Sequence, residues 1–253
     1  MDVQHPPGVS SGTGDPGPSA PALLTWAAMA ASKTAPGRKP GPAADPDQRV
    51  ELLRAAAMLL AQEGPGALTV RRIAAEAGYS TMGVYSRFGG KDGIVEALFV
   101  EGFHGLGEAM TGVPETDDPL TDMLGCGRAY RRFALDHPTS YAVMFERVVP
   151  GYEPTESAQI IANGTFELLV GRVRRAMELG ALPVADALET AQRIWAACHG
   201  WVSLEIHGLI KIDDPDGAAF ERSMVALCGP IELSAPPPRA TRASAPRSTR
   251  RRG

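Results

Sequence analysis

Cysteine, histidine and glutamate lie close together between Cys198 and His207, and such side chains could bind a metal or transfer protons. On one helix, however, His199 and His207 would be about 80° out of line at about 100° per residue, and Cys198 would point away from both. The sequence has no His-x-x-x-His or Cys-x-x-Cys pair and no phosphate-binding loop of the GxxxxGK[ST] kind. We therefore expect no catalytic residue, no metal site, no cofactor and a protein that is not an enzyme.

A second set of polar side chains lies in the segment LTVRRIAAEAGYSTMGVYSRF, residues 68–88. Thr69 can cap a first helix whose apolar residues recur at i, i+3, i+4 and i+7 from Val70. Gly78 can end that helix, and Ser80 can cap a second, short one. This is the helix-turn-helix pattern, whose second helix can enter the DNA major groove, which is about 12 Å wide. The free N–H groups at the start of that helix can also bind a phosphate.

Helical patterns fill most of the remaining chain, and no alternating strand pattern of useful length occurs. We predict an all-α fold: an N-terminal three-helix helix-turn-helix domain over residues 45–110 and a C-terminal helical bundle over residues 111–233. The expected helices, about nine in all, cover residues 45–62, 70–77, 81–88, 91–110, 119–136, 139–148, 156–179, 185–210 and 216–229.

The two ends of the chain differ in composition from its middle. Residues 1–44 are rich in Pro, Gly, Ser and Ala, and we expect them to be disordered, as we expect of the tail 234–253. The tail has six arginines and no acidic residue. Because the formal net charge of the whole chain is −4, the rest of the chain has a net charge of about −10. Three cysteines without a close pair, and no secretory or membrane-length apolar segment, indicate a cytoplasmic protein without membrane contact. Met29 is a second candidate start.

Residues 50–103 resemble the TetR family of transcriptional regulators. The resemblance rests on LLRAAAMLLAQEG, LTVRRIAAEAGYS and VYSRFGGKDGIVEAL and on their spacing. It implies a homodimer whose two reading helices straddle a palindromic double-stranded DNA operator. By position it implies base reading at Thr81 to Gly83 and phosphate contacts at Tyr85 and Lys91. The complete set of DNA-binding residues that it implies is Thr69, Arg71, Ser80, Thr81, Met82, Gly83, Tyr85, Ser86, Arg87 and Lys91.

Gly83 and Arg72 each admit two interpretations. A glycine in the middle of a helix costs about 1 kcal/mol relative to alanine, so Gly83 needs a reason. Either it lets the reading helix sit deep in the groove, or it packs against a neighbouring helix. Arg72 is either a DNA contact or a solvated charge. Because residues 46–101 hold six basic and seven acidic residues, DNA affinity must come from where the charges are placed.

The C-terminal block has two signatures, FALDHPTSYAVMF and WAACHGWVSLEIHG. Together they resemble the TetR C-terminal domain type that is named for its Trp-His-Gly signature, over most of residues 119–228. The resemblance implies a bundle with an internal, mostly apolar pocket for a small, largely apolar effector. Each apolar candidate could instead be ordinary core, and His199 could be a hydrogen-bonded core residue. The candidate lining residues are Phe133, Tyr141, Met144, Phe145, Phe166, Trp195 and His199.

The function that these observations predict is a ligand-responsive, sequence-specific repressor released from its operator by a small molecule. The homodimer is expected to form through the helices near 185–210 and 216–229, where Gly200 and Gly208 on roughly one face would permit close packing. A DNA-binding activator or architectural protein without a ligand remains an alternative, and an enzyme fused to a vestigial helix-turn-helix is a remote one.

Overall fold

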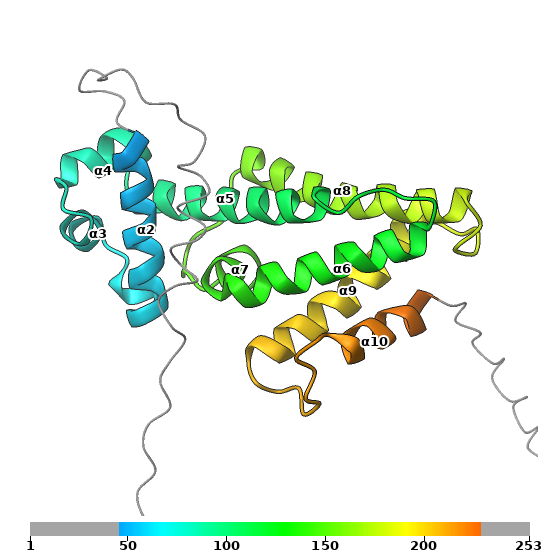
Figure 1. Ribbon diagram of the computed structural model, residues 1–253. Coiled ribbons are helices and arrows are strands. Elements are labelled where there is room, and N and C mark those ends of the chain that lie inside the picture. Colours follow the sequence, from blue (N-terminus) through cyan, green and yellow to red (C-terminus); the bar gives the residue numbers. More distant parts are fainter. Residues whose placement is uncertain (1–45, 229–253) are drawn as a thin grey trace, which may run out of the picture.

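The computed structural model describes residues 46–228, in which nine α-helices and one short 3₁₀ helix occur and no strand (Figure 1). The all-α prediction is therefore confirmed. The predicted disordered ends, 1–44 and 234–253, lie outside the described residues. The elements are α2 (Pro46–Glu63), η1 (Pro65–Ala67), α3 (Val70–Glu76), α4 (Thr81–Phe88), α5 (Lys91–Thr111), α6 (Pro119–Asp136), α7 (Pro138–Phe145), α8 (Glu156–Glu178), α9 (Ala187–Ile206) and α10 (Ala218–Cys228).

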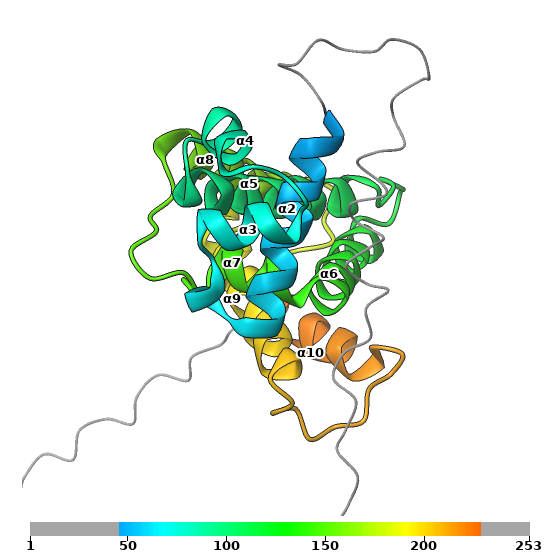
Figure 2. The same cartoon turned by 90° about the vertical axis from the view of Figure 1, so that its left-hand side faces the viewer.

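Helices α2, α3 and α4 form a small unit, which we call the head, at one end of the molecule (Figure 2). Its short helices begin where the sequence places caps, because Thr69 Oγ1 accepts from the N–H of Arg72 and Ser80 Oγ accepts from that of Gly83. Their apolar faces meet α2 and the start of α5 in one core. The fully buried residues at its centre are Leu52, Leu53, Ile73, Val84 and Ile94.

Helix α5 leaves the head and continues into the C-terminal bundle, where it packs against α6, α7 and α8 (Figure 1). Helices α9 and α10 pack against α6 and against each other on the side away from α5. Two arginines of α8 hold the loop between α5 and α6: Arg172 donates to the carbonyl oxygens of Val113 and Pro114, and Arg175 to that of Thr116. The far end of α5 is thus tied to α8.

The last helices are shorter than the sequence suggested. Helix α9 ends at Ile206 and not near residue 210, because Gly208 has a φ of 67° and the N–H of Leu209 bonds to the carbonyl of Leu204. Gly208 therefore ends the helix and does not share a face with Gly200, which corrects that expectation. Helix α7 similarly ends at Phe145, before Arg147, which has a φ of 49°.

Candidate DNA-binding surface and ligand cavity

The start of α3 and the outer face of α4 carry most of the residues expected to bind DNA. Met82 is 72% exposed and Tyr85 55% exposed, so both side chains are accessible to a partner. Gly83, Arg87 and Lys91 are half-buried. The exposed members of the expected set are Thr69, Arg71, Ser80, Thr81, Met82, Tyr85 and Ser86.

Gly83 faces α2. A Cβ built on Gly83 would lie 2.5 Å from Nε2 of Gln48, whose Oε1 accepts from Nε of Arg87 at 2.6 Å. The missing side chain therefore makes room for a polar bridge between α2 and α4. This favours the packing interpretation of Gly83, although the obstacle is the end of a flexible side chain.

Arg72 is held by an acid of the head itself. Its two terminal nitrogens each donate to a carboxylate oxygen of Glu63 at 2.6 Å, and this hydrogen bond raises the pKa of Arg72 above its usual value. Among the described residues, Arg71 makes no such bond, and its side chain is exposed. The geometry thus distinguishes Arg72, whose role the sequence left open, from Arg71, which the sequence assigned to the DNA-binding set.

Acidic side chains of the head and of α5 form ion pairs with arginines that are not expected to bind DNA. Three acids are occupied by basic partners of their own, because Glu63 pairs with Arg72, Glu101 with Arg49 and Glu51 with Arg54. These pairs lie outside the expected set, so its basic residues Arg71, Arg87 and Lys91 keep their charge for a partner. Placement therefore offsets the near-neutral composition of the head.

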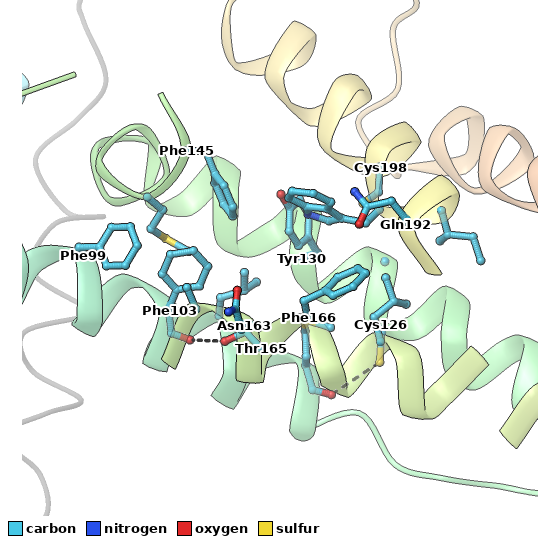
Figure 3. A pocket seen from close by; sticks show the side chains of 18 of the residues that line it. Phe99, Phe103, Cys126, Tyr130, Phe145, Asn163, Thr165, Phe166, Gln192 and Cys198 are labelled. Carbon is cyan, nitrogen blue, oxygen red and sulfur yellow. Dashed lines mark hydrogen bonds between the residues drawn. The ribbon is translucent and has the colours of Figure 1, made fainter. Parts of the chain in front are cut away.

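The bundle encloses an elongated cavity of about 440 Å³ between α5, α6, α7, α8 and α9 (Figure 3). Four of the seven residues expected in a pocket line it: Met144, Phe145, Phe166 and Trp195. The three aromatic rings lie close together, with the Trp195 ring centroid 5.8 Å from that of Phe166 and 6.2 Å from that of Phe145. The remaining three expected residues, Phe133, Tyr141 and His199, are not among the lining residues.

Tyr141 and His199 instead support the cavity wall from behind. Tyr130 lines the cavity, and its hydroxyl lies 3.2 Å from the Tyr141 hydroxyl and 3.1 Å from Nδ1 of His199. The Tyr141 hydroxyl lies 2.6 Å from the same nitrogen. Burial lowers the pKa of His199, which favours the neutral ring as the acceptor in this network. Burial also raises the pKa of Tyr141 to about 12, so both phenols stay protonated.

Several lining residues were not expected in the pocket from the sequence. Phe99, Phe103, Leu106 and Met110 lie on one face of α5, and Tyr130 lies on α6. The signal that could have found them was the i, i+4, i+7, i+11 spacing along α5, but a buried core stripe has the same spacing. Which stripe faces a cavity depends on how the helices cross.

The segment between α7 and α8 forms hydrogen bonds with α5 near the head. Glu96 of α5 accepts hydrogen bonds from the Tyr152 hydroxyl at 3.2 Å and from the N–H and hydroxyl of Thr155. Tyr152 lines the cavity. The segment between α7 and α8 therefore contacts both the space inside the bundle and the helix that enters the head.

The outer faces of α9 and α10 leave apolar groups uncovered in the chain. Leu204 is 46% exposed and Val225 44% exposed. Ala196 is also exposed, and a Cβ on Gly200 would meet nothing within 4 Å. This face, which we call the α9–α10 face, combines small residues with exposed larger ones.

No helix among residues 46–228 is long and apolar enough to cross a membrane. In the same residues, no group of three or more His, Cys, Asp or Glu side chains could hold a metal ion.

Two family sequence models match the chain, one for each part of the fold. The model of bacterial regulatory proteins of the tetR family matches residues 52–98, and that of the tetracyclin repressor-like C-terminal domain matches residues 123–227. The chain belongs to the TetR family of transcriptional regulators. The TetR helix-turn-helix implies binding to a DNA operator, and the family is not enzymatic, in agreement with the sequence.

Known proteins resemble this TetR family member in sequence or in fold. The HTH-type transcriptional regulator Rv1816 of Mycobacterium tuberculosis is 23% identical over 203 residues, which are 66% of this chain and 86% of the relative. The TetR family regulator PfmR of Thermus thermophilus has a TM-score of 0.53 at 21% identity, covering 70% of this chain and 94% of PfmR. The fatty acid degradation regulator FadR of Bacillus halodurans has a TM-score of 0.60 at 17% identity. The match covers 77% of this chain and 99% of FadR.

Proposed function

We propose that this TetR family member is a ligand-responsive repressor, which binds a palindromic operator as a homodimer and leaves it when a small, largely apolar effector enters the bundle cavity. One observation carries the proposal. Helix α5 supplies Lys91 to the expected DNA-binding set and Phe99, Phe103, Leu106 and Met110 to the cavity wall. A single rigid element therefore connects the two sites.

In the proposed complex the residues of the head divide into two kinds. Thr81 and Met82 read base edges in the major groove, because both side chains are exposed at the start of α4. Arg71, Tyr85 and Lys91 bind phosphates and position the helix, as do the free N–H groups near Ser80. Arg87, bonded to Gln48, orients α2 and α4 and adds charge.

The proposed dimer forms through the α9–α10 face. Ala196 and Gly200 let two helices approach closely, and the exposed apolar side chains of Leu204 and Val225 would be covered by the partner copy. Two heads then face half-sites about one helical turn apart. An effector that widens the bundle changes the spacing between the heads, so that they no longer fit both half-sites.

The test is selection from a genomic fragment library by the purified protein at near-physiological salt, with sequencing of the retained fragments. We expect one palindrome to be enriched by the wild type and not by the surface variant Arg71→Gln/Tyr85→Phe. Enrichment of a site without two-fold symmetry, or no enrichment, would contradict the dimeric operator. Deleting the gene should then raise transcription from the enriched promoter; a fall would identify an activator instead.

A further inference from the structure

We propose that the ligand of the bundle cavity is an elongated, uncharged molecule with an aromatic or otherwise apolar body. This proposal rests on the proposed function and deepens it by naming the chemical class of the effector. Its grounds are the shape of the cavity, the chemistry of its walls and the balance of charge at its rim.

The cavity runs along the helices. On α5 its lining extends from Phe99 to Met110, and on α8 from Gln159 to Leu169. At about 1.5 Å per residue, these stretches are about 15–17 Å long, or about three helical turns. A volume of about 440 Å³ spread over that length fits a narrow molecule and not a compact one (Figure 3).

The walls offer no partner to a charge. Apart from Arg147 and Glu153, which are exposed at one end, no lining residue has a carboxylate, ammonium or guanidinium group. The buried polar atoms already have partners, since Thr165 Oγ1 donates to the carbonyl oxygen of Phe103 and Cys126 Sγ to that of Met110. Burial raises the pKa of Cys198 to about 12, so this thiol is neutral as well. A buried ion would therefore lose its hydration without a replacement.

The rim does not favour either sign of charge. A terminal guanidinium nitrogen of Arg147 lies 3.6 Å from a carboxylate oxygen of Glu153, and both side chains of this ion pair are mostly exposed. The other exposed lining residues are the carboxamides Gln159, Asn163 and Gln192. Carboxamides can donate to or accept from a neutral polar group but give no net attraction for an anion or a cation.

The aromatic part of the wall favours a flat or chain-like apolar body. Phe103, Tyr130, Phe145, Phe166 and Trp195 come from five different helices and meet around the middle of the cavity. Their edges and faces can pack against an aromatic ligand ring at separations of about 4.5–7 Å between centroids, as is general for aromatic pairs.

Two fluorescent probes with the same ring skeleton test the charge requirement. N-phenyl-1-naphthylamine is neutral, and 8-anilino-1-naphthalenesulfonate adds a sulfonate. We expect the neutral probe to bind the full-length wild type at least tenfold more tightly, with quenching of tryptophan emission. Equal or tighter binding of the sulfonate, or no binding of the neutral probe, would overturn the proposal.

Variants of lining residues test whether the probe binds in the cavity and whether charge at the rim controls which probe binds. Ala162→Phe fills the cavity and should lower the affinity for the neutral probe at least fivefold; if that variant fails to fold, Trp195→Phe should reduce the quenching. Gln192→Arg should raise the affinity for the sulfonate at least threefold, whereas the matched Gln192→Glu should not. Unchanged affinities in the folded variants would place the probe outside the cavity and refute the inference.

This experiment is independent of DNA. If the neutral probe binds as expected but retention of the operator does not change, the ligand class stands and the proposed ligand response fails. If no operator is found at all, the result from the probes keeps its meaning.

Discussion

The head and the bundle of this TetR family member present their chemistry in opposite ways. In the head, the residues expected to act are on the outside, and the core beneath them is small and fully buried. In the bundle, the residues expected to act surround an internal space. Substitutions of exposed residues on the head should therefore change binding to DNA without changing stability, whereas substitutions around the cavity should change ligand binding and packing together.

The largest expected effect tests whether the two parts depend on each other. Val84 is fully buried in the head, and Val84→Asp would place an unpaired charge there at a cost of about 4 kcal/mol or more. We expect operator binding to disappear while the neutral probe still binds the bundle. Circular dichroism and probe titration measure the two outcomes. Loss of probe binding as well would show that head and bundle unfold as one unit.

The second effect separates the two neighbouring arginines. Arg71→Gln should weaken operator binding about tenfold, or about 1.4 kcal/mol, because a free guanidinium at a phosphate is lost. Arg72→Gln is the matched control and should leave binding unchanged, since Glu63 already holds that guanidinium. Fluorescence anisotropy at fixed salt measures both. Equal losses would place Arg72 on the DNA.

The third effect concerns the kind of DNA contact. Tyr85→Phe removes only a hydroxyl, and one lost hydrogen bond should weaken binding several-fold, about 1 kcal/mol. Because the proposed acceptor is a phosphate, the loss should be similar for the operator and for unrelated DNA. A loss confined to one operator base pair would assign Tyr85 to base reading instead.

A change of sequence preference is expected at the start of α4. Thr81→Ala should alter the preference at one base pair by about 1 kcal/mol, as judged by selection from a randomised operator library. Ser86→Ala, on the same helix, should not. If the preferred sequence of Thr81→Ala is that of the wild type, Thr81 does not read a base.

The smallest effect at physiological salt is expected from the tail. Deleting residues 234–253 removes six arginines, and the dependence of log affinity on log salt should become shallower by about 0.9 for each arginine that had neutralised a phosphate. Affinity measured at several salt concentrations gives this slope. An identical slope would exclude the tail from the interface with DNA.

The sequence predicted the head more completely than the bundle, for a physical reason. The caps Thr69 and Ser80 act within three residues of themselves, so local sequence determines where α3 and α4 begin. The roles of Gly83 and Arg72 depend on Gln48 and Glu63, which belong to another helix, and local sequence does not reveal them.

Prediction of the cavity from the sequence was limited for the same reason, because the cavity depends on how several helices are placed. Aromatic residues of α7, α8 and α9 were expected in a pocket, but whether Phe145 or Tyr141 faces it depends on the rotation of α7 against its neighbours. The contribution of α5 was missed because a helix that lines a cavity and a helix that fills a core have the same apolar period. The end of α9 was misplaced because Gly208 was assigned to packing and not to the helix terminus.

The anchoring of the far end of α5 has a mechanical consequence. Because Arg172 and Arg175 fix the loop just after Thr111, the 21-residue helix can act as a rod that turns about that end. Phe103 lies about 12 Å from the pivot and Lys91 about 30 Å, so a sideways movement of the wall is magnified about 2.5-fold at the head. A ligand that displaces Phe103 by about 1 Å would thus move each reading helix by about 2.5 Å. Spin labels on Ser86 of the two protomers would measure that gain directly, and unchanged label distances with ligand bound would show that α5 bends instead of turning.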